Sequence, residues 1–414
     1  MSAPRASDPV FNAAELARVV AAAPHRLLFL GGATAVLLSM SWWALVLVAQ
    51  RSGTFALPLP LLPAGWAHAI GMQYQALPMF MFGFLLTVFP RWMGLKPYTR
   101  WHYLPVGGCL LLGYLLFHGG LLGVPVLLHT GLVLTIIGWC IGLALLLRLL
   151  WQDGGKNWHA IACWCALSFG LLGLLMTARY LHGGDARLIF GAIKIGSFGL
   201  LLPVFLTVCH RMLPFFSQGV IPGYRMYRPG WLLGLLQALI FTHLLLELAH
   251  AYAWLWLVDA PLTGLCAWLS WRWQLWAARK VRLLFALHLG FAWLTVTFAL
   301  YTLQSAWFAA SGDFILARAP VHALTVGFFG SLLVAMVTRV TQGHSGRPLE
   351  MGSIAWLCFC LLQAVALLRI AAELLPDTPS WLAVAALGWV VAFLPWVLRS
   401  AWIYLTPRTD GQPG

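Results

Sequence analysis

Long apolar runs recur along the whole chain, and short segments that carry charges, Pro and Gly separate them. Each run is long enough to cross a bilayer as an α-helix, and it lacks the alternating pattern of roughly ten residues that marks a strand of a membrane β-barrel. We therefore predict an all-α, polytopic integral membrane protein with about 12 transmembrane helices. The predicted spans are residues 26–50, 66–89, 103–122, 124–150, 159–182, 188–210, 231–249, 252–271, 283–310, 319–340, 352–374 and 380–404.

The segments outside the spans are short, so we predict one transmembrane domain over residues 26–404. Residues 1–25 form a cytoplasmic N-terminal segment and residues 405–414 a short cytoplasmic tail. No small-residue cleavage site follows the first span, which indicates an uncleaved first helix rather than a signal peptide. The sequences of residues 1–207 and 208–414 show no recognisable repeat.

Composition excludes a soluble globular protein. Apolar residues make up 61% of the 414 and charged residues only 9%, whereas about a quarter of a soluble domain is charged. The formal charge of +14 has a topological explanation, because 19 of the 25 Lys and Arg fall on the side of both termini and four on the other side. The positive-inside rule then predicts cytoplasmic termini in the inner (cytoplasmic) membrane, and no nucleic acid partner is needed.

The 13 His are unusual in a chain with so few charged residues, since each is an interfacial residue, a hydrogen-bonding residue or a metal or haem ligand. His68 opens the second predicted span and His322 the tenth, so both imidazoles lie at matching depth near the non-cytoplasmic face. Two such rings can hold a haem iron between them. The alternative is two isolated His with hydrogen-bonding partners. Haem propionates would need cations, and Arg179 and Arg318 are two of the four basic residues on that face.

A second candidate site lies at the end of the seventh predicted span, where His243, Glu247 and His250 occupy positions i, i+4 and i+7 of one helical face. Two imidazoles and a carboxylate suit copper or non-haem iron. The alternative is a Glu–His pair and one unrelated His. Asp259 in the eighth span and Lys194 in the sixth are further ionisable residues in apolar surroundings, and with Glu247 they are candidates for proton transfer.

Several stretches together resemble the NnrS family of membrane proteins, which are described as haem- and copper-containing and linked to nitric oxide. They are GFLLTVFPRWMG at 83–94, HRMLPFFS at 210–217, LHLGFAWL at 287–294 and HALTVGFFGSLLVAMVTRVTQGHSGRPL from 322 onward. Many relatives carry a W-H-x-H-E-M type sequence in the second helix. This chain has Trp66-Ala-His68-Ala-Ile-Gly-Met72 there, so that motif implies a ligand at His68 alone.

The resemblance implies that haem ligation by His68 and His322 is the favoured interpretation, and it adds His210 and His288 as candidate metal ligands within family-like blocks. The helix count and the ligands at the outer ends of helices 2 and 10 are also similar to the catalytic subunit of haem-copper oxidases and nitric oxide reductases. In those proteins helices 2 and 10 hold a haem and helices 6 and 7 supply the second metal. This second likeness is an analogy of fold alone.

We therefore expect a membrane haem protein that binds nitric oxide and detoxifies it, as a nitric oxide reductase-like oxidoreductase with haem and copper or non-haem iron. Glu247 and Asp259 would transfer protons. No C-x-x-C-H haem attachment motif occurs, so electrons would come from a quinol or a separate protein. One alternative is a non-enzymatic protein that senses or sequesters nitric oxide or metal nitrosyls, and another is a 12-helix secondary transporter.

Overall fold

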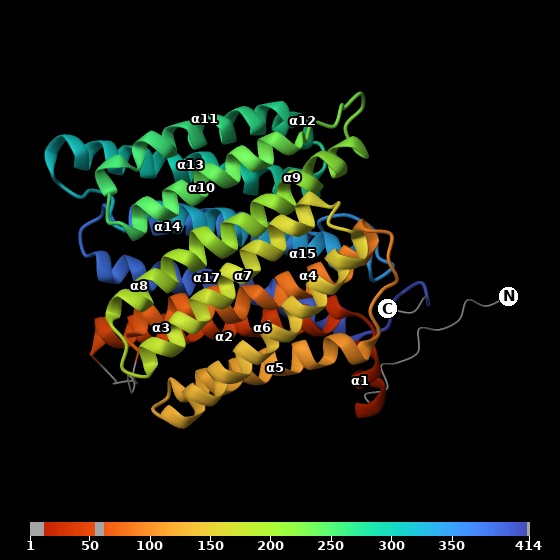
Figure 1. Cartoon of the computed structure of the whole chain (residues 1–414). Helices are drawn as coiled ribbons and strands as arrows, with labels where there is room; N and C mark the ends of the chain where they lie inside the picture. Colours follow the sequence, from red (N-terminus) through yellow and green to blue (C-terminus); the bar gives the residue numbers. More distant parts are fainter. Residues whose placement is uncertain (1–11, 54–61, 412–414) are drawn as a thin grey trace.

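The computed structural model describes residues 12–53 and 62–411, and this part of the chain contains helices and connecting segments but no β-strand (Figure 1). Eleven of the described helical stretches are long and apolar enough to cross a membrane. A twelfth helix, α11 (Trp256–Arg272), has 17 residues and packs along the neighbouring span α13. The predicted all-α, polytopic membrane architecture is confirmed.

The helices follow the predicted order. The first six spans are α2 (Pro24–Ser52), α3 to α4 (Ala64–Trp92), α5 (Arg100–Gly120), α6 (Pro125–Asp153), α7 (Trp158–Leu181) and α8 to α9 (Ala186–Gln218). The remaining spans beside α11 are α10 (Gly230–Leu248), α13 (Arg282–Ser311), α14 to α15 (Ala319–Gly343), α16 (Ser353–Ala371) and α17 (Thr378–Leu405). The largest difference concerns the sixth span, which was predicted to end at residue 210 and ends at Gln218. The helix continues beyond the apolar run because the polar residues that follow remain helical.

Spans two, six and ten each contain a π-helical segment. These segments are η1 (Gly71–Ala76), η2 (Ile195–Leu201) and η4 (Ala323–Gly330). The same three spans are the most buried of those long enough to cross a membrane, at 89%, 72% and 72% of their apolar windows, so they form the centre of the bundle. A π-helical segment thus recurs at every fourth span. A recurrence of this kind occurs three times along the chain, so a comparison of residues 1–207 with residues 208–414 does not reveal it. It differs from the two-part repeats of many secondary transporters.

Side chains from neighbouring helices bond to the backbone at these π-helical segments. The amide of Gln73 in η1 donates to the carbonyl of Ile193 (3.2 Å), and the Tyr74 hydroxyl donates to the carbonyl of Ala192 (2.5 Å), just before η2. The indole of Trp139 on α6 donates to the carbonyl of Tyr74 (3.1 Å). A π-helical segment breaks the regular helical pattern, and the bilayer interior offers no water to the freed carbonyls. These bonds therefore join spans two, four and six.

The first and last spans lie side by side and are tied together at both ends. Arg26 donates to the carbonyl of Thr406 (2.8 Å) at one end, and Arg51 pairs with Asp377 (3.1 Å) at the other. A hydrogen bond from Ser380 and the nearby Arg51 guanidinium lower the pKa of Asp377. Helix α1 (Ala13–Val20) and the end of α17 lie at the same end of the bundle (right in Figure 1), which we call the terminal end. The other end is called the opposite end.

We expect Gly113→Ala on α5 to destabilise the protein. A Cβ atom there would lie 2.8 Å from the backbone nitrogen of Thr135 and 2.9 Å from the carbonyl oxygen of Gly131, so α5 and α6 would have to separate. Such overpacking costs about 1–3 kcal/mol. The matched control is Gly108→Ala on the same helix, where a Cβ atom meets nothing within 4 Å. The apparent melting temperature in detergent should fall by several degrees for the first variant alone, and equal values for both would contradict the packing argument.

Candidate functional site

A chain of four ionisable side chains crosses three helices near the opposite end. The ammonium of Lys194 on α8 lies 2.7 Å from Oε2 of Glu247 on α10. The other carboxylate oxygen, Oε1, lies 3.7 Å from Nε2 of His243, one turn deeper on the same helix. Nδ1 of His243 lies 2.7 Å from Oδ1 of Asp259 on α11 and donates a hydrogen bond to it. The other oxygen of this carboxylate, Oδ2, is buried without a hydrogen-bond partner among the described residues. The residues that were predicted as proton-transfer candidates are thus in one contact chain, with His243 as the link between them.

Burial of this Lys194–Asp259 chain increases from one end to the other. The side chain of Lys194 is 24% exposed, that of Glu247 3%, and those of His243 and Asp259 are fully buried, so Lys194 is the most exposed member. Apolar rings surround the imidazole of His243, with Phe198 at 4.1 Å and Tyr301 at 4.9 Å between ring centroids. Two carboxylates in such surroundings require two cations, and they have them when the imidazole carries a proton. The chain can therefore hold a proton and release it.

The same geometry does not fit a metal centre. Helix α10 ends at Leu248, and His250 lies beyond it with a positive φ of 55°, so the predicted three-residue helical face is wrong for His250. The imidazole of His250 instead stacks on Phe190 and bonds the hydroxyl of Tyr252. Lys194 occupies the position beside the Glu247 carboxylate that a metal cation would take. Across residues 12–53 and 62–411, no group of three or more His, Cys, Asp and Glu is arranged to hold a metal ion.

His68 and His322 also lie at the opposite end, at the start of spans two and ten, as predicted. The ring of His68 stacks on Trp43 of α2, with 4.8 Å between centroids and an angle of 12°. Nδ1 of His322 donates to the carbonyl of Arg318 (2.9 Å), and this bond leaves Nε2 as the acceptor nitrogen. Within the described residues, Nδ1 of His68 is buried and has no hydrogen-bond partner. The two rings lie within electrostatic range of each other.

Two cations act on this His68–His322 pair, and only one of them was predicted. Arg318, whose side chain is exposed, interacts electrostatically with His322, whereas Arg179 is exposed and donates to the carbonyl of His182, which caps the end of α7. Arg369 on α16 was not predicted; it interacts electrostatically with both imidazoles, and it pairs with Glu373 at 2.7 Å. The sequence contained a signal for this pair, because Arg369 and Glu373 have the i, i+4 spacing at which opposite charges meet on a helix.

The remaining candidate His lie towards the terminal end and do not join either group. His210 is buried, and its Nδ1 lies 3.1 Å from Nε2 of His159. His288 is buried beside the hydroxyl of Ser217, at 2.9 Å from Nε2. His344 donates from Nδ1 to the carbonyl of Val340, and burial lowers its pKa, which keeps the imidazole neutral. That His210 and His288 bind metal remains a prediction. The two residues have different neighbours, so they do not form one site with each other.

Comparison with known families and proteins gives one match. The model of a family described as NnrS protein matches residues 19–408, which is nearly the whole chain. The match includes both groups at the opposite end and all of the spans. No curated protein matches the sequence.

We expect Lys194→Met to destabilise the protein by about 3–5 kcal/mol, because it leaves the buried Glu247 carboxylate without its cation. The double variant Lys194→Met/Glu247→Gln removes both charges and should regain most of the loss. Lys156→Met is the control, since this Lys is exposed at the terminal end. Thermal unfolding in detergent measures all three. An unchanged apparent melting temperature for Lys194→Met would show that the ion pair does not hold Glu247 in the protein.

Proposed function

The chain belongs to the NnrS family, whose members are linked to nitric oxide, and on this premise we propose that it is a membrane haem protein that binds nitric oxide and removes it by reduction. The observation that carries the proposal is the His68–His322 pair, in which two imidazoles lie at the start of two different central spans. Nδ1 of His68 has no hydrogen-bond partner among the described residues, and the bond from Nδ1 of His322 leaves its Nε2 as the acceptor nitrogen.

We infer that His68 and His322 would hold a haem at this place. The bond from Nδ1 of His322 to a backbone carbonyl is the arrangement that orients a ligating imidazole. Arg369 would attract a propionate, because it is a largely buried cation close to both rings. When bound, the haem supplies an iron centre that takes up nitric oxide and exchanges electrons.

Reduction of nitric oxide needs protons as well as electrons. Two molecules of nitric oxide, two electrons and two protons give one nitrous oxide and one water, with the electrons from a quinol or a separate donor protein. We assign proton transfer to the Lys194–Asp259 chain, in which Glu247 and Asp259 hold protons and His243 passes them between the two carboxylates. The exposed part of Lys194 is the point of entry.

The membrane orientation belongs to the same proposal. The excess of Lys and Arg on the side of both termini supports a cytoplasmic terminal end in the inner membrane. The His68–His322 pair and the Lys194–Asp259 chain would then face the periplasmic half of the bilayer, so protons would enter from that side.

Binding without reduction is the second candidate function. The ammonium of Lys194 beside Glu247 favours it, because joining two nitric oxide molecules at paired metals requires a second metal site that this cluster does not offer. The protein would then sense or sequester nitric oxide, with the same haem and no turnover.

His68→Ala and His322→Ala should each lower the haem content of the purified protein by more than half, because each removes one of the two imidazoles that would hold the haem. His129→Ala is the matched control, since His129 contacts His182 and no member of the pair. The measurement is a pyridine haemochrome assay together with iron analysis on the same samples. Full haem content in both variants would overturn the assignment of the site.

Asp259→Asn should slow anaerobic consumption of nitric oxide by roughly 100-fold while the haem content stays normal, because the variant removes a proton acceptor and keeps the size of the side chain. Asp377→Asn, an exposed carboxylate at the same end of the bundle, is the control. A nitric oxide electrode with excess reductant records the rate. Haem-loaded wild-type protein that binds nitric oxide but does not consume it would instead establish the binding role.

A further inference from the structure

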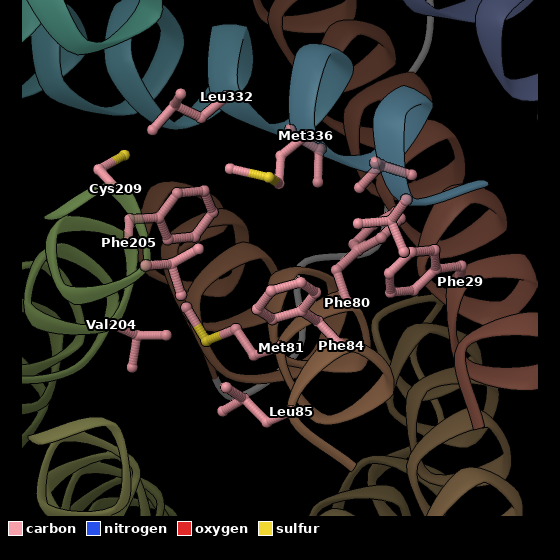
Figure 2. A pocket seen from close by; sticks show the side chains of 14 residues that line it. Phe29, Phe80, Met81, Phe84, Leu85, Val204, Phe205, Cys209, Leu332 and Met336 are labelled. Atoms are coloured by element: carbon pink, nitrogen blue, oxygen red, sulfur yellow. The ribbon is translucent and has the colours of Figure 1, made fainter. Parts of the chain in front are cut away.

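The centre of the bundle contains a cavity of about 60 Å³ between α2, α4, α9 and α15 (Figure 2). It lies where the three π-containing spans meet, on the terminal side of their π-helical segments. Fourteen residues line it, and all of them are apolar. The lining includes Phe29 from α2, Met81 and Phe84 from α4, Phe205 from α9, and Met336 and Val337 from α15.

The chemistry of this lining restricts what the cavity can hold. A buried water needs two to four polar partners, and hydrocarbon, aromatic and sulfur-containing side chains do not provide them. Apolar cavities of this kind stay dry and bind xenon or, at about 150 Å³, benzene. A cavity of about 60 Å³ is too small for a ring and large enough for a molecule of two heavy atoms. The occupant is therefore small, uncharged and apolar.

The position of the cavity indicates how such an occupant would reach it. Met81 lies 13 residues after His68 on the same span, and Met336 lies 14 residues after His322. The cavity and the His68–His322 pair thus lie on the same two central spans at different depths. An apolar gas partitions into the hydrocarbon of the bilayer, which surrounds this part of the bundle.

We propose that this cavity is a binding site for a small apolar gas, and that nitric oxide is its occupant in the cell. The identity of the gas rests on the proposed function, whereas the existence of the site rests on the cavity alone. The site holds nitric oxide in the centre of the bundle and raises its local concentration below the His68–His322 pair.

Xenon tests the site without reference to nitric oxide. Full-length protein in nanodiscs is titrated with dissolved xenon, and bound xenon is followed by ¹²⁹Xe NMR. We expect one saturable site in the wild type and an at least tenfold weaker signal in Val337→Phe, whose ring fills the cavity. Val334→Phe is the matched control, because Val334 is buried on the same helix and does not line the cavity. If either variant fails to fold, Val204→Leu/Val337→Leu and Val334→Leu replace the pair.

The outcomes separate this inference from the proposed function. Absence of saturable xenon binding in the wild type, or equal binding in Val337→Phe and its control, overturns the gas site and leaves the haem proposal untouched. Saturable xenon binding that Val337→Phe abolishes supports the gas site even if the protein neither binds nor consumes nitric oxide, in which case the proposed function fails alone. A raised KM for nitric oxide with unchanged kcat in Val337→Phe links the two.

Discussion

A backbone carbonyl in the hydrocarbon of a bilayer must find a donor within the protein, because no water is present to replace one. The three central spans meet this requirement in an unusual way, since each contains a π-helical segment that breaks the regular helical pattern. The indole of Trp139 donates to the carbonyl of Tyr74 within η1, and the hydroxyl of Tyr74 donates to the carbonyl of Ala192, three residues before η2. The spans that hold the candidate site are therefore fixed relative to one another by hydrogen bonds as well as by packing.

This arrangement explains why the polar groups can lie where they do. Lys194 is the last residue of α8, directly before η2, and His322 is the last residue of α14, directly before η4. Each thus lies at a point where the helical pattern changes, and its direction depends on that change. Two ionisable residues of the candidate site therefore lie at junctions between α-helical and π-helical backbone.

The sequence predicted the order and approximate limits of the spans because hydrophobic length is a property of each segment alone. Eleven of the twelve predicted spans are long and apolar enough to cross a membrane among the described residues. The sequence also predicted the common depth of His68 and His322. It did not predict the π-helical segments, since these depend on donors such as Gln73 that a different helix provides. His250 was misplaced for a similar reason, because the helix ends two residues earlier and no periodicity marks that end. The role of Arg369 depends on which spans become neighbours in space.

The contact between α2 and α17 has a consequence for biosynthesis. The first span leaves the ribosome long before the last, and yet its apolar partners, such as Ala383 and Ala386 against Ala44 and Leu47, are the last to be made. Until then, one flank of α2 faces lipid or the insertion machinery rather than its final neighbour. Closure of the bundle must therefore follow the synthesis of α17, and a ribosome that stops before α17 leaves a product with an open seam that membrane quality control can recognise.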